Sequence, residues 1–354
     1  MSGLIHKLFD GLSALLFPLY ELTGGIEGKG HKPPKKILLI KPDHLGDVVL
    51  TTPAIAAVHD HFPKAEIWYL AKSTSLPVLQ NNPAISRLIE FNAPWCCRLG
   101  EKAMTIGELS KLSRLLRRER FDISVAFQDN ARTHLFAAYC GIPRRLGYAP
   151  RGGKHLLTDN LPPPNEDEHA LISHNRLVKA IGAKPDEFPT QIFLTEEEEK
   201  EGKSSLAECS LLFHVGAAHA GKMVSVELGG RIMKAVAQSC HCKIALIGGK
   251  AEQERVKAIH SQCAEETKVV PTTSLRHLAA LIKAARVFIG HDSGPGHISS
   301  AVSTNSVILF GQGNPTRWAP WGDQARVVRA NDCKNIEAIE PKEVADIVKE
   351  LLTE

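Results

Sequence analysis

Residues 37–61 read ILLIKPDHLGDVVLTTPAIAAVHDH and predict a strand, a polar turn and a helix in immediate succession. The apolar run 37–40 is of the kind that fills a parallel strand buried on both faces. The turn at 41–47 is polar, and the helix predicted over 48–61 carries Pro53 in its early turns. The stretch is therefore typical of the first strand–loop–helix unit of an open parallel sheet.

The same alternation of apolar runs and amphipathic stretches continues along the chain in two series. Strands are predicted at 66–70, 88–91 and 123–127, and in the second series at 211–215, 243–247, 286–289 and 306–310. Helices are predicted at 76–81, 104–120, 169–181, 226–239, 252–262, 277–284 and from 297 onward. We therefore expect an α/β protein with two Rossmann-like domains. The predicted division is 1–34 for an amphipathic segment and linker, 35–185 for the first domain and 186–354 for the second.

The acidic run 196–201 lies near the boundary between the two series. It is predicted to open a further helix, with Thr195 as the N-cap and Glu198 completing a capping box. This structural role accounts for the run without a bound partner.

Composition narrows the class of protein. The 354 residues carry 43 Lys and Arg against 39 Asp and Glu, an excess too small for a dedicated nucleic-acid-binding protein, so no nucleic acid partner is expected. A hydrophobic share of 43% and a charged share of 23% exclude fibrous and wholly disordered classes. The 8 cysteines are scattered along a chain without a cleavable signal peptide, which favours free thiols in a reducing cytosol. Cys240, His241 and Cys242 lack a second ligand pair at zinc-site spacing.

The amino-terminal residues 3–23 form a separate amphipathic segment. Their apolar side chains recur at helical spacing and make one strongly apolar face, while Pro18 would kink or end the helix. Such a helix either packs on the protein's own surface or lies in a membrane interface, and the pattern leaves both interpretations open. A linker rich in Gly and Lys follows at 24–36. No run reaches the roughly 18 apolar residues needed to span a bilayer.

Three loops directly follow predicted strands, and ligands of such sheets bind at the carboxyl ends of the strands. In the first loop, Gly46 permits close backbone approach and Asp47 lies at or beside a helix amino terminus. Local spacing alone favours Asp47 as a helix cap, since Asp is a preferred residue there. The alternative is a general base that faces a cleft between the domains.

The second loop reads GHDSGPGH at 290–297 and opens onto a helix. Free backbone N–H groups, small residues and the helix dipole together make a site suited to an anion such as a diphosphate. Ordinary turn chemistry explains the glycines but gives no reason for His291, Asp292 and His297 together. Ser293 lacks the flanking glycines of the hydrolase Gly-x-Ser-x-Gly turn, which argues against a hydrolase.

The third loop, 216–222, matches the spacing of a P-loop up to Lys222. Met223 stands where a P-loop needs Ser or Thr to hold Mg²⁺, so the match fails at the residue that carries the metal chemistry. What remains is a lysine suited to phosphate oxygens. Further along, Glu252 follows another predicted strand and is suited to accept hydrogen bonds from ribose hydroxyls.

Together these segments resemble the family 9 glycosyltransferases, typified by the ADP-heptose:lipopolysaccharide heptosyltransferases. The resemblance rests on the order and spacing of the motifs at 37–53, 213–222, 246–252 and 287–311, and it extends over roughly residues 35–350. It implies a GT-B fold, in which two Rossmann-like domains face each other across a cleft. The acceptor would bind to the amino-terminal domain and the sugar nucleotide to the carboxy-terminal one.

The resemblance also implies roles for individual residues. Asp47 matches the family's catalytic base, which reverses the local preference for a helix cap. The donor-binding positions that it implies are Lys222, Glu252, Asp292, Ser293, Gly294 and His297. No metal ligand is implied, because Lys222 and the helix amino terminus would stabilise the leaving diphosphate. The acceptor-binding residues are not indicated.

The implied function is an inverting, metal-independent glycosyltransferase that moves a heptose from ADP-heptose onto a lipopolysaccharide-core or similar glycolipid acceptor. Ala217 and Ala218 stand where the family often has hydroxyl residues at the donor phosphates, so another nucleotide sugar is an alternative. A non-catalytic sugar-nucleotide-binding module and a P-loop phosphotransferase are the other classes left open. We expect no cofactor and a cytoplasmic protein, peripheral at the inner face of the cytoplasmic membrane, with residues 3–23 as the candidate contact. The basic residues Arg144, Arg145, Arg151, Lys154 and His155 either meet an anionic glycolipid or form a solvated loop.

Overall fold

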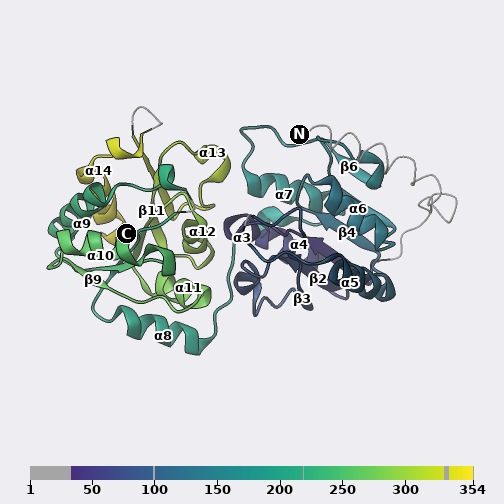
Figure 1. Cartoon of the computed structure of the whole chain (residues 1–354), viewed down its shortest axis with the longest axis horizontal. Coiled ribbons are helices and arrows are strands. Elements are labelled where there is room, and N and C mark those ends of the chain that lie inside the picture. Colours follow the sequence, from purple (N-terminus) through teal and green to yellow (C-terminus); the bar gives the residue numbers. More distant parts are fainter. Residues whose placement is uncertain (1–32, 99, 218, 331–334, 354) are drawn as a thin grey trace.

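The computed structural model describes residues 33–98, 100–217, 219–330 and 335–353, and its strands form two six-stranded parallel sheets. Figure 1 shows each sheet with its helices as one lobe, and the two lobes lie side by side. The N-terminal lobe runs from β1 to α7 in purple and teal, and the C-terminal lobe runs from α8 to α14 in green and yellow. The predicted α/β class with two Rossmann-like sheets is confirmed.

The N-terminal lobe alternates strands with helices from its first residues. Its strands are β1 (Lys36–Ile40), β2 (Glu66–Ala71), β3 (Arg87–Glu90), β4 (Ile123–Ala126), β5 (Arg144–Tyr148) and β6 (Asp159–Leu161). Its helices are α3 (Leu45–Val49), α4 (Thr52–His61), α5 (Ile106–Glu119), α6 (Ala131–Tyr139) and α7 (Ala170–Lys179). Single 3₁₀ turns are η1 (Leu76–Leu79), η2 (Lys154–Leu156) and, in the segment that joins the lobes, η3 (Pro185–Glu187).

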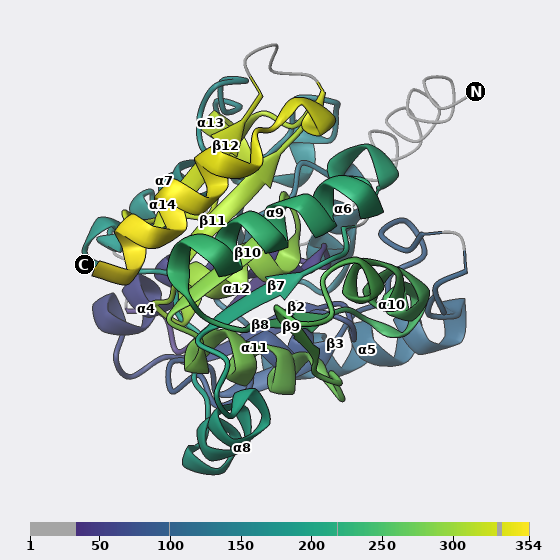
Figure 2. The same ribbon diagram turned by 90° about the vertical axis from the view of Figure 1, so that its left-hand side faces the viewer.

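The C-terminal lobe repeats this pattern, and Figure 2 looks onto it with α9 and α14 in front of its sheet. Its strands are β7 (Leu211–His214), β8 (Ile244–Ile247), β9 (Thr267–Val269), β10 (Val287–His291), β11 (Asn305–Phe310) and β12 (Ala325–Arg329). Its helices are α8 (Glu196–Leu206), α9 (Val226–Cys240), α10 (Gln253–Gln262), α11 (Leu275–Ala284), α12 (Gly294–Ala301), α13 (Pro315–Trp318) and α14 (Pro341–Thr353). Its 3₁₀ turns are η4 (Ala220–Lys222), η5 (Lys250–Glu252) and η6 (Ile336–Ala338).

The strand order is the same in both lobes, β3-β2-β1-β4-β5-β6 in the first and β9-β8-β7-β10-β11-β12 in the second. In each sheet the first and fourth strands are therefore neighbours, β1 beside β4 and β7 beside β10. The chain crosses to opposite sides of the sheet on leaving these neighbours, which opens a crevice at their carboxyl ends. Ligands of doubly wound sheets bind at this crevice, so each lobe has one such position.

The helix predicted over 48–61 is in fact two helices, α3 and α4. Pro53 has no N–H to donate to the carbonyl of Val49, and the hydroxyl of Thr52 donates to that carbonyl instead, at 2.8 Å. The chain changes direction at this point, so α3 does not continue into α4. It packs instead against α12 of the other lobe.

Several other elements differ from those predicted. The helix predicted at 76–81 is the single turn η1, which has Pro77 at its start. Strand β5 was missed because its sequence, Arg-Arg-Leu-Gly-Tyr, shows neither alternation nor a continuous apolar run. The further elements that the pattern did not predict are α6, β6, β9, β12, α13 and α14.

The acidic run at the start of α8 serves a structural purpose, as expected. Thr195 and Glu198 form the predicted capping box, in which the Thr195 N–H donates to Glu198 Oε2 at 2.8 Å. Glu198 also pairs with Arg276 of α11. The Arg276 guanidinium donates to the carbonyl of Phe193 at 2.7 Å and, in the N-terminal lobe, to that of Pro77 at 2.9 Å. This arginine therefore ties the two lobes together on the side where α8 lies.

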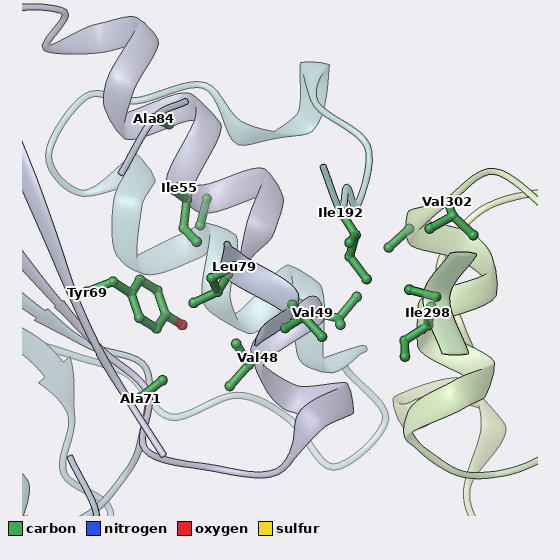
Figure 3. Close-up of a cluster of buried hydrophobic side chains, with 14 of the residues drawn as sticks. Val48, Val49, Ile55, Tyr69, Ala71, Leu79, Ala84, Ile192, Ile298 and Val302 are labelled. Atoms are coloured by element: carbon green, nitrogen blue, oxygen red, sulfur yellow. The ribbon is translucent and has the colours of Figure 1, made fainter. Parts of the chain in front are cut away.

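Apolar side chains from both lobes share one buried cluster. Figure 3 shows Val49 and Ile192 directed toward Ile298 and Val302 of the C-terminal lobe. The backbone of the joining segment is held in the same place, since the N–H of Ile192 donates to the Ala301 carbonyl at 3.0 Å. The lobes therefore meet through α3, the joining segment and α12.

Some predictions fall outside what the structure describes. Residues 1–32 are not among the described residues, so the amphipathic segment 3–23 stays a prediction, as do the division points between 34 and 35 and between 185 and 186. In the described ranges no helix has the length and apolar character needed to cross a membrane. The cysteines within those ranges are free, as the composition indicated.

Candidate functional site

A cleft of about 760 Å³ lies between the two lobes, where the crevices of the two sheets face each other. The loops that follow β1, β7, β8 and β10 all contribute to its lining. This is the position at which doubly wound sheets bind ligands. The residues predicted to be catalytic or donor-binding all line this cleft: Asp47, Lys222, Glu252, Asp292, Ser293, Gly294 and His297. His291, which the sequence also singled out, is buried and does not line it.

Asp47 lies in the first turn of α3, and the local interpretation of this residue as a helix cap is wrong. The N-cap position belongs to His44, whose side chain makes no capping hydrogen bond. The Asp47 carboxylate lies instead 3.7 Å from the ammonium of Lys41 and keeps a side-chain exposure of 18% in the cleft. It is therefore available to a bound molecule.

Lys41 is the buried cation of this corner of the cleft, with a side-chain exposure of 6%. Its ammonium donates to the carbonyl of Phe127 at 3.3 Å and lies 3.4 Å from Asp43 Oδ2. The side-chain amide of Gln128 donates to the same Asp43 oxygen at 3.0 Å. Phe127 and Gln128 follow β4, so the neighbouring strands β1 and β4 together build this cluster.

The two carboxyl groups beside Lys41 differ in their ionisation. Burial raises the pKa of Asp47 above its usual value, and the Asp43 carboxylate adds to this rise while Lys41 opposes it. Burial would raise the pKa of Asp43 as well, but Lys41, the Gln128 amide and a backbone N–H outweigh it and lower that pKa to about 2. Asp43 is therefore the firmly ionised group of the two, and Asp47 is the one that takes up a proton more readily.

The loop before α12 forms the opposite wall. Ser293 is the N-cap residue of α12, and its side chain makes no capping bond to the helix, so the helix amino terminus opens on the cleft. Backbone N–H groups and the dipole of such a terminus attract an anion. His297 is buried in the first turns, where burial lowers its pKa to about 3 and keeps the imidazole neutral.

Lys222 and Asp292 form a close ion pair beside this helix terminus, with Nζ 2.6 Å from Oδ2. Lys222 ends the turn η4 after β7, and Asp292 follows β10, so the pair joins the loops of neighbouring strands. Asp292 is buried with a side-chain exposure of 6%, whereas Lys222 keeps 34% of its side chain exposed. The lysine is therefore the accessible cation on the C-terminal wall.

Glu252 closes the end of the cleft near β7 and β8. Its carboxylate accepts a hydrogen bond from the Gly249 N–H at 2.6 Å and lies 3.7 Å from His214 Nε2. The same carboxylate packs on Gly216, where an added β-carbon would lie 1.5 Å from Glu252 Oε1. Glu252 is fixed by these contacts and retains a carboxylate oxygen for a hydroxyl donor.

The loop 216–222 is not a P-loop. In a P-loop the glycine-rich loop leads directly into a helix that holds the phosphates. Here η4 ends at Lys222 with Met223 as its cap, and α9 begins only at Val226 after its own cap, Ser225. The interpretation as a phosphotransferase site is therefore wrong.

Sequence reasoning missed several residues on the N-terminal wall. Arg98 lines the cleft, and Glu101 beside it accepts a bond from the buried Lys72 at 2.5 Å. His44 also lines the cleft, although no role was predicted for it. Lys41 could have been suspected, because it directly follows a buried strand.

Two basic residues considered for glycolipid binding have structural roles instead. Arg145 is buried in β5 and donates to the carbonyls of Leu156 and Ile142, each at 2.6 Å. Arg144 pairs with Asp159 of the neighbouring strand β6 at 2.9 Å. Neither guanidinium lines the cleft, because hydrogen bonds within the sheet edge hold both in place.

The sequence matches the model of one family, described as glycosyltransferase family 9 (heptosyltransferase), over residues 109–345. The chain is 22% identical over 315 residues to lipopolysaccharide heptosyltransferase 2 of Escherichia coli K12, covering 83% of this chain and 88% of that protein. It is 25% identical over 290 residues to lipopolysaccharide heptosyltransferase 3 of the same strain, covering 78% and 82%.

Solved structures show the same architecture. The glycosyl transferase family 9 protein from Veillonella parvula superposes with a TM-score of 0.78 at 22% identity, covering 90% of this chain and 97% of that one. The E. coli ADP-heptose lipopolysaccharide heptosyltransferase II superposes with a TM-score of 0.74 at 22% identity, covering 90% and 98%. The fold of this chain is therefore the GT-B fold of these enzymes.

Proposed function

The chain belongs to glycosyltransferase family 9, and on that basis we propose that it transfers a heptose from ADP-heptose to a lipopolysaccharide-core or similar glycolipid acceptor. One observation carries the proposal. A carboxylate from the N-terminal lobe, Asp47, and a cation beside a helix amino terminus of the C-terminal lobe, Lys222, line the same cleft. A transfer reaction between two bound molecules needs a base at one and anion stabilisation at the other.

The C-terminal wall is suited to the diphosphate of a sugar nucleotide. The amino terminus of α12, at Ser293 and Gly294, offers backbone N–H groups, and Lys222 offers a point charge next to it. Asp292 holds Lys222 in place, and it would also accept hydrogen bonds from hydroxyls of the donor sugar. Glu252, fixed by Gly249, would accept hydrogen bonds from the ribose hydroxyls.

Asp47 would act as the general base. As the acceptor oxygen forms its bond to the anomeric carbon, its proton passes to an Asp47 carboxylate oxygen. The bond between that carbon and the diphosphate oxygen breaks, and the leaving nucleoside diphosphate takes the electron pair. Asp47 and the α12 terminus belong to opposite walls of the cleft, which favours attack from the face opposite the nucleotide and inversion at the anomeric carbon.

Metal independence is part of the proposal. The negative charge that develops on the leaving diphosphate would be stabilised by Lys222 and by the N–H groups at the start of α12. These groups supply the positive charge that Mg²⁺ supplies in many phosphate sites.

The choice of ADP-heptose is supported by the relatives. One solved structure with a TM-score of 0.75 is that of an E. coli heptosyltransferase with ADP, and the relatives found in sequence include heptosyltransferases of lipopolysaccharide and of lipooligosaccharide. The loop at Ala217 lacks the hydroxyl groups that the family often carries there. A different nucleotide sugar therefore stays the alternative donor.

A lipid-linked, anionic acceptor is proposed for the N-terminal wall. Arg98 is exposed there, and the neighbouring Glu101 pairs with Lys72, so among the described residues no acidic side chain pairs with the guanidinium, which could meet an acidic group of the acceptor. A glycolipid acceptor would place the enzyme at the inner face of the cytoplasmic membrane. The apolar face predicted for residues 3–23 would then lie in the membrane interface.

Calorimetric titration with ADP, UDP, GDP and ATP, each in EDTA and in Mg²⁺, tests the donor. We expect ADP to bind most tightly of the four nucleotides, with the same affinity in EDTA and in Mg²⁺. Preference for UDP or GDP would support another sugar nucleotide, and binding of Mg²⁺-ATP alone would overturn the proposal. ADP-heptose with heptose-deficient lipopolysaccharide then tests transfer, and NMR of the product tests inversion at the anomeric carbon.

Sedimentation with vesicles of anionic phospholipid tests the membrane contact. Leu12→Glu places a charge on the apolar face of residues 3–23, whereas Ala14→Glu places it in line with Lys7 and Glu21 on the polar face. We expect the first variant to lose vesicle binding and the second to keep it. Equal binding by both variants would remove the membrane role of this segment.

A further inference from the structure

Asp43 forms part of the cleft corner described above, yet the proposed reaction gives it no task. Its two carboxylate oxygens are both engaged, one by the His44 N–H at 2.9 Å and the other by Gln128 at 3.0 Å. The oxygen that accepts from Gln128 also lies 3.4 Å from the Lys41 ammonium. Asp43 is thus held in one orientation by groups from two strand ends.

Three oxygen atoms lie near the Lys41 ammonium, and the Asp47 oxygen is the most distant of the three. The ammonium lies 3.3 Å from the Phe127 carbonyl and 3.4 Å from Asp43, but 3.7 Å from Asp47, beyond hydrogen-bond distance. Among the described residues, no donor lies within full hydrogen-bond distance of the Asp47 carboxylate, and Lys41 interacts with it only weakly, from 3.7 Å. Its lone pairs are therefore left open toward the cleft.

The same cleft contains a Lys–Asp pair of the opposite kind. Lys222 and Asp292 are separated by 2.6 Å, a full charge-assisted hydrogen bond. In general, an ammonium that donates directly to a carboxylate makes that carboxylate a weaker base than a more distant ammonium does, because the cation stabilises the ionised form. Without a competing acceptor, Lys41 would be free to form such a pair with Asp47.

We propose that Asp43 is a positioning residue that holds the Lys41 ammonium away from Asp47, so that Asp47 stays basic enough to take the acceptor proton. This inference rests on the proposed function, in which Asp47 is the base. The Lys41 ammonium stabilises the ionised form of Asp47 from ion-pair distance. Asp43 limits this stabilisation because it also attracts the ammonium. Gln128 fixes Asp43 and thereby the length of the Lys41–Asp47 separation.

Most of the other ionisable side chains near Asp47 do not change their charge near neutral pH, and the one that titrates in the acid range is His44. Burial raises the pKa of Tyr69, lowers that of His174 and lowers that of His297 to about 3, so these stay neutral near neutral pH. Burial also lowers the pKa of His44, which is the remaining group that titrates in the acid range. By element, the groups that act on Asp47 are Lys41, Asp43 and His44 before α3 and Tyr69 of β2. His174 of α7 lies near Lys41 and Asp43, His297 of α12 packs against Gly46, and Lys222 lines the same cleft.

The test is the pH dependence of kcat, at saturating donor and acceptor, for Asp43→Asn and wild type. Removal of the Asp43 charge frees Lys41 to approach Asp47, so the acid limb should move to lower pH by about one unit, the size produced by one nearby charge. The plateau value of kcat should fall, since Asp47 becomes a weaker base. Asp43→Ser removes the same charge from a smaller side chain and should give the same shift if the first variant folds poorly.

Asp129→Asn is the matched control. Asp129 lies next to Gln128 in sequence, pairs with Arg151 at 3.7 Å and does not line the cleft. It should leave the acid limb in place. An acid limb at the wild-type pH in both Asp43 variants, whatever their kcat, would overturn the positioning role.

Failure of the inference is distinguishable from failure of the proposed function. If Asp47→Asn retains wild-type turnover, Asp47 is not the base and the proposed mechanism fails. If Asp47→Asn is inactive while both Asp43 variants keep the wild-type acid limb, the mechanism stands and only the role of Asp43 fails.

Discussion

Gly46 of α3 lies against the imidazole of His297 in α12, so closely that a β-carbon on Gly46 would lie 2.4 Å from His297 Cδ2. The contact is matched one turn away, where a β-carbon on Gly294 would lie 2.6 Å from Leu45 Cδ2. Helix α3 carries Asp47, and the amino terminus of α12 forms the proposed diphosphate site. The two helices therefore come into contact at two glycines, one in each helix. The width of the cleft between them depends on these two glycines.

Gly46→Ala should separate α3 from α12 or displace His297. Overpacking of this kind costs about 1–3 kcal/mol of folding free energy, and the shift of Asp47 relative to the donor site should lower kcat more than it lowers ADP affinity. Thermal unfolding, ADP titration and turnover measure the three effects. Gly107→Ala in α5 is the control, since its β-carbon would have only an ordinary contact at 3.9 Å. Wild-type turnover in Gly46→Ala would show that the close approach is not required.

Asp47→Asn keeps the shape of the side chain but removes its basicity. A general base contributes about 10²- to 10⁴-fold, so kcat should fall by that factor while ADP binding stays within error of wild type. Rapid-quench turnover and calorimetry make the comparison. Asp186→Asn, at an exposed ion pair with Lys179, should change neither quantity. A parallel loss of ADP binding in Asp47→Asn would point to a role in holding the donor.

Lys222→Met removes the accessible cation of the C-terminal wall. The loss of one charge-assisted bond to a diphosphate, about 1.5–3 kcal/mol, should weaken ADP binding by about 10- to 100-fold. Because the variant also leaves the buried Asp292 unpaired, the double variant Lys222→Met/Asp292→Asn separates the two effects. Compared with Lys222→Met, the double variant should regain thermal stability but should not regain ADP binding. Recovery of both would mean that Lys222 acts only by balancing Asp292.

The stability of the fold should fall as the pH is lowered from about 6.5. Burial lowers the pKa of His291 and of His297 to about 3, whereas in the unfolded chain both titrate near 6.5. Between these values the unfolded state binds more protons, so each histidine destabilises the fold by at most about 1.4 kcal/mol per pH unit of acidification. Denaturant unfolding at stepwise pH measures the slope. His297→Gln should flatten it, and an unchanged slope would assign the effect to other groups.

The sequence predicted the strands that are buried on both faces and the loops that follow them. Runs such as 37–40 and 211–213 are continuous and apolar because helices cover both faces of their sheets, so the pattern is strong there. The position of a strand's carboxyl end then places the next loop at the cleft. For this reason the sequence pattern could place the loops after β1, β7, β8 and β10 at strand ends, whereas their grouping across one cleft followed from the resemblance to the family 9 glycosyltransferases.

Elements at the sheet edges could not be predicted in this way. Arg145 is buried in β5 because the carbonyls of Leu156 and Ile142 accept its N–H groups, and a sequence pattern shows no such partners. The sequence pattern did not predict the cluster around Lys41, for a related reason. Its geometry depends on Phe127 and Gln128, which reach it only because β4 pairs with β1.

The identical order of strands in the two lobes separates the tasks of the enzyme along its gene. In the proposed function, the crevice built by β1 and β4 would face the acceptor, and the crevice built by β7 and β10 would face the donor. Mutations that retune one substrate therefore fall in one half of the coding sequence and leave the other half's loops untouched. The two specificities are free to evolve independently, provided that the glycine contact between α3 and α12 is kept.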